Sequence, residues 1–431
     1  MLITDTTIVN AQYVIEQHRD IRIQDGKIQE IAEHGKCMQT DTDTVNGRDL
    51  LFMPGLIDSH MHTGQQLLRG QVLDELPMIW TRIMLPFEST LTPEKMRFSA
   101  ELAALEMIHA GTAGFVDAGS YYMEEAAEVY RQSGLRGALS YSTMDQKGLP
   151  ESIADTAKGA LEKTDALYDG FHRQGNLKVY YSLRALMSCS VELMEGAAAR
   201  AQERDTMLQA HMNEYAGEVN FALERYGMRP YEFLANRGIL SSQFLGAHSL
   251  MLSEKETELL QEYEVKICHC PFSNCAKAVP NTPAYLNRGI SVGLGTDGTA
   301  HGGMSLWNEM KIFRSVMNVR YGAPAAEPRI MPAETILQMV LEGGAAALNE
   351  AGSIGKLETG YRADLIGISL NQPHLLPSRN LIHTLVESVN ANDVTHMMVD
   401  GKWIMKNREI LTLDEERILY QARNWMRKGE E

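Results

Sequence analysis

The sequence predicts an α/β protein, a (β/α)8 TIM barrel with a small β-sandwich domain formed from both chain ends. In the middle of the chain short β-rich segments alternate with longer helical ones, as βα units do around a parallel sheet. Alternating apolar strands with Asp-Gly turns occur near both ends. A chain of 431 residues also suits one large and one smaller domain. We therefore expect the small domain at residues 1–52 with 353–431 and the barrel at 53–352.

The two chain ends carry similar β patterns. Residues 1–50 contain the alternating segments LITDTTIVN and DIRIQDGKIQEIA, and Asp25-Gly26 within the second predicts a hairpin turn. THMMVDGKWIMKNREIL places Asp400-Gly401 between similar apolar segments. These ends are therefore expected to pair as halves of one β-domain.

Eight candidate strands follow one another in the middle of the chain: FMPGLIDSHMH, GTAGFVDAG, RGALSYSTMD, KVYYSLRAL, MLQAHMNE, FLGAHSL, VKICHCPFSN and SVGLGTDG. Amphipathic stretches separate them. One is expected to begin with Thr92 as N-cap and Pro93 as first helical residue, and to end at Gly111. Eight such strands predict a closed barrel, whose chemistry lies at the carboxyl ends of the strands.

Composition limits the partners and the compartment. A net charge of −16 argues against nucleic acid or an anionic membrane as the main partner. The first ten residues lack a basic n-region, and no apolar run approaches the roughly 20 residues of a membrane span. Five cysteines, an odd number, favour a reducing cytoplasm over a disulfide framework. We expect a cytoplasmic protein that binds a small molecule.

Side chains able to bind a metal or move a proton gather at the ends of four predicted strands: His60, His62, His211, Glu214, His248 and Asp297. Because His60 and His62 are two apart, both imidazoles point to the same side of a strand and can meet one metal. Taken singly, the HxH spacing is a weak signal, a lone strand-end histidine is more often structural, and Asp297-Gly298 would be interpreted as a turn. The joint pattern, in one eightfold alternation, is much stronger.

The segments PGLIDSHMH, QAHMNE, GAHSL and GLGTDG resemble the signature segments of the amidohydrolase superfamily. The flanking segments MLITDTTIVN and GKLETGYRADLIGIS match that family too, so the resemblance covers essentially the whole chain. By that resemblance the metal ligands are His60, His62, His211 and Asp297. The resemblance also implies catalytic roles for Glu214 and His248, which Asp297 shares.

The expected cofactor is a single Zn2+, with Fe2+ as the alternative. Two-metal relatives bridge their ions with a carboxylated lysine on the fourth strand. Here the carboxyl end of that strand offers Arg184, and Lys178 lies at the wrong end. Imidazoles with one carboxylate suit Zn2+ but do not exclude Fe2+.

The expected reaction is hydrolytic deamination of a nitrogen heterocycle. The metal lowers the pKa of a bound water from about 15.7 towards 7. Asp297 can accept the proton of that water, and His248 orients the hydroxide. Glu214 is placed to protonate a ring nitrogen and then the leaving group. The His211-x-x-Glu214 pair favours this reaction over amide hydrolysis.

Two resemblances bear on the substrate. HTGQQLLRG and LPMIWTRIMLPFESTLTPE resemble deaminases of adenosine, methylthioadenosine and S-adenosylhomocysteine, in which a residue matching Glu88 holds the ribose and one matching Trp80 lines the pocket. The third and fourth strands depart from that group. Arg184 and Gln65 instead match guanine deaminase, where the Arg binds a ring carbonyl and the Gln binds the base. Together they could donate to the carbonyl of an oxo-purine or pterin, a role that suits the planar guanidinium. A purine- or pterin-like ring is therefore expected, with the adenosine-type reading as the alternative.

Other residues are candidates for the pocket. His269 and His301 are expected to reach the substrate, and Met61, Met78 and Met84 are candidates for an apolar wall. Cys268 and Cys270 fall on one face of a strand, and no second pair completes a structural zinc site.

Two further functions stay open. Triazine hydrolases share the scaffold and expel chloride or alkylamine by the same attack. A non-catalytic barrel is the weakest interpretation, because every expected metal ligand is present. Barrel enzymes of this kind often self-associate, so we expect a homo-oligomer.

Overall fold

A computed structural model of the protein describes residues 1–38, 43–76 and 79–428. Its central strands form two parallel five-stranded sheets. The first sheet has the order β15 (Asp297–Gly298), β6 (Leu56–His62), β7 (Thr112–Asp117), β8 (Arg136–Leu139), β9 (Leu177–Val179). The second has the order β10 (Tyr181–Leu183), β11 (Leu208–Met212), β12 (Phe244–His248), β13 (Lys266–His269), β14 (Val292–Leu294). Each predicted strand segment contains at least one of these strands.

The two parallel sheets adjoin each other at two places along the chain. Only Tyr180 separates β9 from β10, and only residues 295–296 separate β14 from β15. Every pairing within both sheets is parallel, so all ten strands end on a common side. That side is where polar side chains from different strands can meet.

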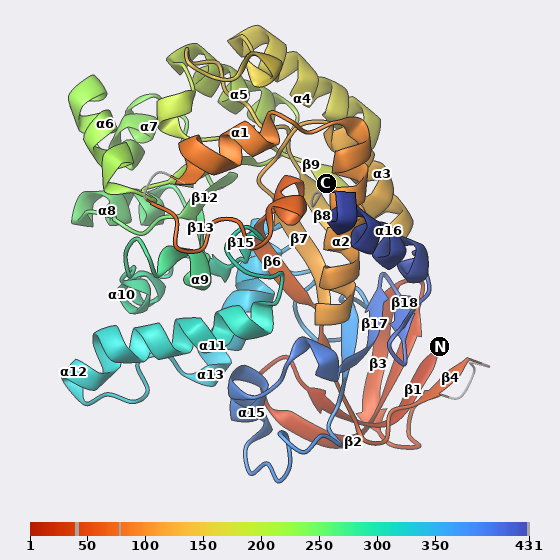
Figure 1. Ribbon diagram of the computed structural model, residues 1–431. Helices are drawn as coiled ribbons and strands as arrows, with labels where there is room; N and C mark the ends of the chain where they lie inside the picture. The colour runs from red at the N-terminus through yellow and green to blue at the C-terminus, as the bar shows by residue number, and fades with distance from the viewer. Residues whose placement is uncertain (39–42, 77–78, 429–431) are drawn as a thin grey trace.

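Helices lie on the outside of these sheets (Figure 1). The longer ones are α2 (Pro93–Ala110), α3 (Met123–Ser133), α4 (Ala157–Phe171), α5 (Val191–Glu203), α6 (Ala216–Tyr226), α8 (Glu254–Glu262) and α11 (Leu306–Met317). The shorter ones are α1 (Leu85–Glu88), α7 (Pro230–Asn236), α9 (Pro271–Asn274), α10 (Thr282–Asn287), α12 (Ala323–Ala325), α13 (Ala333–Gln338), α14 (Gly344–Ala347) and α15 (Leu381–Glu387). The last helix, α16 (Glu415–Lys428), packs on α2.

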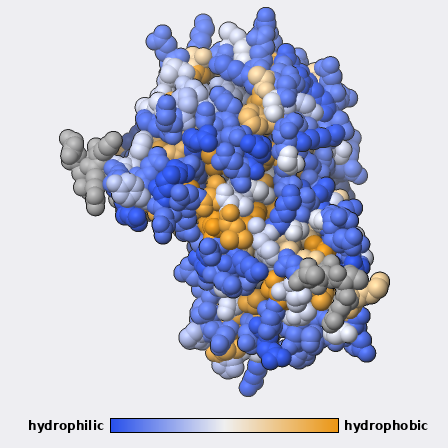
Figure 2. Space-filling model, turned by 90° about the vertical axis from the view of Figure 1, so that its right-hand side faces the viewer, coloured by the Kyte–Doolittle hydropathy of each residue, from blue (hydrophilic) through white to orange (hydrophobic). Residues whose placement is uncertain are grey.

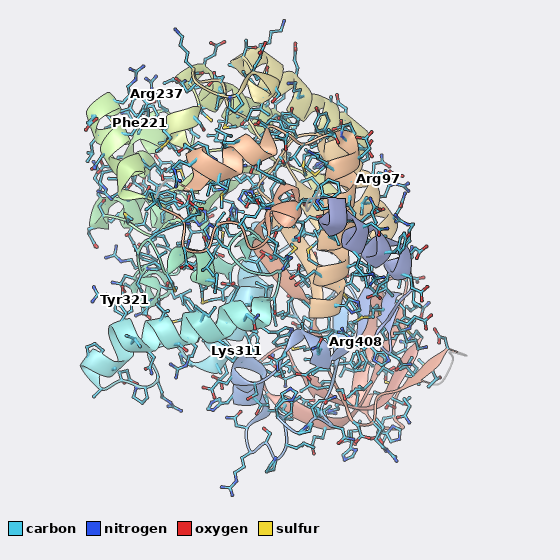
Figure 3. All side chains as sticks on the ribbon, in the orientation of Figure 1. Arg97, Phe221, Arg237, Lys311, Tyr321 and Arg408 are labelled. Carbon is cyan, nitrogen blue, oxygen red and sulfur yellow. The ribbon has the colours of Figure 1, made fainter. Side chains whose placement is uncertain are left out.

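The predicted ends of α2 are confirmed. The Thr92 side chain accepts a hydrogen bond from the backbone N–H of Lys95 at 3.3 Å, as an N-cap does. Gly111 ends the helix with φ +78°, a left-handed conformation that glycine adopts without a Cβ clash. Surface ion pairs join neighbouring helices. Arg97, at the outer edge in Figure 3, reaches Glu125 of α3 at 3.0 Å.

Strands from both chain ends form one nine-stranded sheet, lower right in Figure 1. Its order is β19 (Glu409–Ile410), β18 (Lys402–Lys406), β17 (Val394–Val399), β16 (Leu365–Ser369), β5 (Leu50–Pro54), β1 (Leu2–Val9), β2 (Ile15–Gln24), β3 (Lys27–Glu33), with β4 (Thr44–Asn46) beside β1. The antiparallel pair β5–β16 joins the two ends. The expected boundary between residues 52 and 53 falls inside β5. The two-layer sandwich stays a prediction.

Both predicted hairpin turns are confirmed, and they touch each other. Asp25 and Gly26 have φ +53° and +74°, and Asp400 and Gly401 have φ +51° and +72°. Positive φ at both central residues is the geometry of a type I′ turn. A Cβ added to Gly401 would lie 3.0 Å from the Cα of Gly26. The two chain ends therefore meet at these turns, where a larger residue would clash.

None of the described helices combines the length and apolarity that a membrane span requires. Most of the surface seen in Figure 2 is hydrophilic, and an apolar patch lies near the centre of that face. The hydrophilic surface accords with the net charge of −16.

A buried ion pair ties the parallel sheet to the nine-stranded sheet. Arg136 of β8 donates to the Asp364 carboxylate through Nε at 2.6 Å and through Nη2 at 3.2 Å. Asp364 directly precedes β16 and also accepts the backbone N–H of Asp400 at 2.7 Å. Arg136 is 4% exposed and Asp364 is 6% exposed. Removal of Arg136 would leave the Asp364 carboxylate buried with a backbone N–H but without the cation that it pairs with.

Arg136→Met is expected to lower the free energy of unfolding by about 3–5 kcal/mol, because the Asp364 carboxylate then stays buried and unpaired. Urea unfolding followed by circular dichroism measures the loss. Arg131→Met is the control, since Arg131 pairs with Glu128 on the exposed surface of α3. Its expected effect is within about 0.5 kcal/mol. Equal effects of the two substitutions would contradict the proposed role of the buried pair.

Candidate active site

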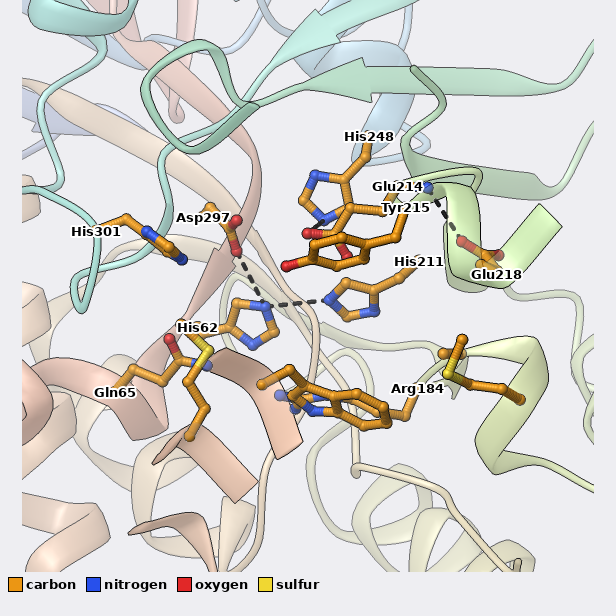
Figure 4. Close-up of a pocket in the computed structure, with 14 residues that line it drawn as sticks. His62, Gln65, Arg184, His211, Glu214, Tyr215, Glu218, His248, Asp297 and His301 are labelled. Carbon is orange, nitrogen blue, oxygen red and sulfur yellow. Dashed lines mark hydrogen bonds and ion pairs between the residues drawn. The ribbon is translucent and has the colours of Figure 1, made fainter. Parts of the chain in front are cut away.

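A pocket lies over the carboxyl ends of the parallel strands (Figure 4). Fourteen residues line it: His62, Gln65, Trp80, Met84, Arg184, Ala185, Met187, His211, Glu214, Tyr215, Glu218, His248, Asp297 and His301. Nine of the twelve residues predicted for the site belong to this set. The other three, His60, Glu88 and His269, are buried behind its wall.

Three imidazoles and one carboxylate converge at the bottom of this pocket. The Nε2 atoms of His62 and His211 are 3.2 Å apart. Asp297 Oδ1 lies 3.3 Å from His62 Nε2 and 3.7 Å from His60 Nε2. Two overlapping groups have their ligand atoms within 4.8 Å of one another: His60 with His62 and His211, and His60 with His248 and Asp297. The strands therefore bring together all four predicted metal ligands.

The donor set fits a divalent metal ion. Four ligand atoms at about 2.0–2.1 Å from a tetrahedral Zn2+ are about 3.3 Å from one another, close to the separations observed. Both ring nitrogens of His60 and Nε2 of His248 are buried without a hydrogen-bond partner among the described residues. Buried polar atoms are rarely left unpaired, so these atoms call for a cation or a ligand.

The protonation states also suit a metal. Burial lowers the pKa of His211 well below its ordinary value, so this imidazole is neutral and offers a lone pair. Burial raises the pKa of Asp297, but the adjacent His60 and His62 side chains outweigh that effect and hold this pKa well below its usual range. A neutral imidazole and an ionised carboxylate are ligands that Zn2+ and Fe2+ both accept.

Asp58 holds two of the ligand-bearing segments together, and sequence reasoning missed it. Its carboxylate accepts the backbone N–H of His60 at 3.1 Å and that of Thr296 at 3.1 Å. The Thr296 hydroxyl donates to it at 2.6 Å. Asp58 thereby fixes β6 against the residue that precedes Asp297. Its position two residues before His60 could have indicated this role from the sequence.

Glu214 and His248 lie on the same side of the pocket, with a lysine that sequence reasoning also missed. Glu214 Oε1 is 3.7 Å from His248 Nε2 and contacts the buried Lys277 ammonium. Burial raises the pKa of the Glu214 carboxyl, but positive charge at His248 and Lys277 shifts it below the usual value overall. Because burial lowers the pKa of His248 to about 3, Lys277 supplies this charge at neutral pH. Glu214 is therefore ionised.

Gln65 and Arg184 do not present free donors to the pocket. Gln65 Nε2 donates to Glu88 Oε1 at 3.1 Å, and Arg184 Nη2 donates to the same oxygen at 2.9 Å. The second oxygen of Glu88 and Oε1 of Gln65 have no hydrogen-bond partner within the described part of the chain. These donors, expected to meet a ring carbonyl, are turned towards Glu88 instead. The unpaired atoms of this cluster are acceptors.

Some of the remaining predicted pocket residues line the pocket, and others do not. Trp80, His301 and Met84 line the pocket. Met61 lies in the hydrophobic core, and Met78 is outside the described residues. His269 lies behind His248, and its Nδ1 is 2.7 Å from the His248 carbonyl oxygen. Contact of His269 with substrate stays a prediction that this placement does not favour.

Comparisons with known proteins agree with this geometry. The model of the amidohydrolase family matches residues 51–404. The chain is 32% identical to a 5-methylthioadenosine/S-adenosylhomocysteine deaminase of Caldanaerobacter subterraneus, over 94% of this chain and 92% of the relative. It is 34% identical to a 5'-deoxyadenosine deaminase of Methanosarcina acetivorans, over 93% and 91%. The crystal structure of an adenosine deaminase from Xanthomonas campestris with bound zinc superposes with a TM-score of 0.92 at 25% identity, over 99% and 98%.

His211→Ala is expected to remove most of the bound metal, because it deletes one corner of the ligand cluster. The measurement is metal content by mass spectrometry after reconstitution with Zn2+ and gel filtration. His383→Ala is the control, since His383 is an exposed residue of α15. Full metal content in the purified His211→Ala protein would contradict the ligand assignment.

Proposed function

Because the chain belongs to the amidohydrolase family, we propose that this metal-dependent aminohydrolase acts on an adenosine-type nucleoside. It hydrolyses a non-peptide C–N bond and deaminates an amino-substituted nitrogen heterocycle. The observation that carries the proposal is the cluster of His60, His62, His211 and Asp297 beside Glu214 and His248. Zn2+ is the proposed metal, and Fe2+ is the alternative.

Each residue of the cluster has a distinct proposed role. His60, His62, His211 and Asp297 would hold the divalent metal, which supplies Lewis-acid activation of water at neutral pH. Ionised Glu214 accepts one proton of the attacking water and delivers it to a ring nitrogen, which keeps it. Asp297 takes the second proton, from the added hydroxyl, for delivery to the leaving amine, and His248 orients the attacking oxygen. Its contact with Lys277 fixes the carboxylate in place. Attack at the ring carbon that bears the amine breaks the C–N bond and releases ammonia.

The acceptors around Glu88 support a nucleoside. A ligand that approaches Glu88 and Gln65 must bring donors, and ribose hydroxyls are donors. A ring carbonyl would need Arg184 to turn away from Glu88. Breaking a buried ion pair by removing one partner costs about 3–5 kcal/mol, which disfavours that arrangement. Deamination of an oxo-purine or pterin is the second candidate, since Arg184 and Gln65 both line the pocket.

We also propose the finer features of the fold and setting. The near-continuous strands at β9–β10 and β14–β15 support closure of the two parallel sheets into one (β/α)8 barrel. The pairing of β5 with β16 supports a separate small β-domain built from both chain ends. The composition supports a cytoplasmic enzyme with a small-molecule substrate and no nucleic-acid or membrane partner. Self-association into a homo-oligomer remains an expectation from the family.

The test is ammonia release by the Zn2+-reconstituted protein from adenosine, 5'-deoxyadenosine, methylthioadenosine, adenine, guanine, a pterin and a triazine. We expect release from the nucleosides. Glu88→Gln should lower kcat/KM for adenosine by roughly 10- to 100-fold, the loss of one to two hydrogen bonds to a charged group, and should change it less for adenine. Glu124→Gln, an exposed acid on α3, is the control.

Either of two results would count against the proposal. Release from guanine or the pterin alone would favour the second candidate and return Arg184 to carbonyl recognition. No release from any compound, with metal bound, would contradict deamination and direct attention to other leaving groups.

A further inference from the structure

The side chain of Asn274 links the backbone of α9 to the imidazole of His248. Asn274 is 3% exposed and is the last residue of α9. Its Oδ1 accepts the backbone N–H of Cys270 at 2.8 Å, and its Nδ2 lies 3.0 Å from His248 Nδ1. Because a backbone N–H only donates, the oxygen must face Cys270 and the amide nitrogen must face His248.

This orientation decides which nitrogen of His248 carries the proton. Asn274 Nδ2 is a donor, so His248 Nδ1 accepts and has no proton of its own. The single proton of a neutral imidazole is then on Nε2. The Nε2–H is therefore directed to the side where Glu214 Oε1 lies, 3.7 Å away.

The backbone that carries His248 is held as firmly as its ring. His248 has φ +67°, a left-handed conformation that is strained for a residue with a Cβ. The His248 carbonyl oxygen accepts the Nδ1–H of His269 at 2.7 Å. Asn274 is also fixed, because its carbonyl oxygen accepts the backbone N–H of Lys277 at 2.8 Å. Rotation of the His248 ring is therefore restrained at both of its ends.

We infer that Asn274 is a positioning residue that makes His248 a hydrogen-bond donor and excludes it from the metal ligand set. Geometry alone leaves two candidate groups, because His248 with His60 and Asp297 is as compact as His60 with His62 and His211. A protonated Nε2 has no lone pair for a metal. The amide of Asn274 therefore rules out the group that contains His248. The catalytic consequence of this inference rests on the proposed function. The protonation state of His248 does not depend on that function.

Asn274→Asp tests this inference by the exchange of one NH2 group for an oxygen. The aspartate keeps an oxygen for the Cys270 N–H but replaces the donor to His248 by an acceptor. His248 Nδ1 must then carry a proton. We expect kcat to fall on the order of 10²–10³-fold, the cost of losing one oriented donor at a reaction centre.

The decisive readout is ¹⁵N NMR of histidine-labelled, metal-loaded protein, with the His248 signals identified by their loss in His248→Gln. The expected wild-type ring has its proton on Nε2, and the Asn274→Asp ring is protonated on Nδ1. Asn281→Asp is the control, since it adds the same charge at an exposed position seven residues along. It should leave both the NMR signals and kcat unchanged.

Asn274→Ala is a second variant, which tests the inference if the Asn274→Asp protein does not fold. Without the amide, His248 loses its fixed tautomer, and Nδ1–H signals should appear beside Nε2–H signals. A wild-type His248 protonated on Nδ1 would overturn the inference. So would an Nε2–H signal that persists unchanged in both variants. If the wild type carries Nε2–H yet deaminates nothing, the inference survives and the proposed function fails.

Discussion

The structure depends on one constraint: buried imidazoles and one buried carboxylate must lie together at a single point. Three histidine rings lie with centroids 4.8–5.2 Å apart, and the ring nitrogens of His60 find no hydrogen-bond partner among the described residues. Such a cluster costs free energy as an empty site and gains it when a cation binds. The parallel sheets serve this purpose, because they bring the ends of β6 and β11 and the first residue of β15 to one place.

Rigid support around the cluster follows from the same constraint. Asp58 ties β6 to Thr296, and positive φ angles at His248 and Asp297 turn these side chains inward at the strand ends. Strained backbone persists only where its surroundings hold it in place. Asn274 adds a second constraint, because it determines which nitrogen of His248 carries the proton. The site thus separates imidazoles that offer a lone pair from one that offers a proton.

The parallel strands and the metal cluster could be predicted from the sequence because their signals are local. The spacing of His60 and His62 sets both rings on one side of a strand, and the order of strands places His211 and Asp297 at the same edge. The Arg184–Glu88 pair could not be predicted in this way, since its partners are 96 residues apart and no spacing rule joins them. Asn274 ends the short helix α9 and Lys277 follows it, so the direction of this helix decides which residues they contact. The domain division stays a prediction, and its expected boundary between residues 52 and 53 lies inside β5.

The most direct measurement of the metal centre is X-ray absorption at the zinc edge of the Zn2+-reconstituted protein. The structure predicts only nitrogen and oxygen ligands, at about 2.0–2.2 Å, from His60, His62, His211 and Asp297 with or without solvent. Cys268 on β13 and Cys270 directly after that strand are both buried. A sulfur shell at about 2.3 Å would place zinc on these cysteines and contradict the account.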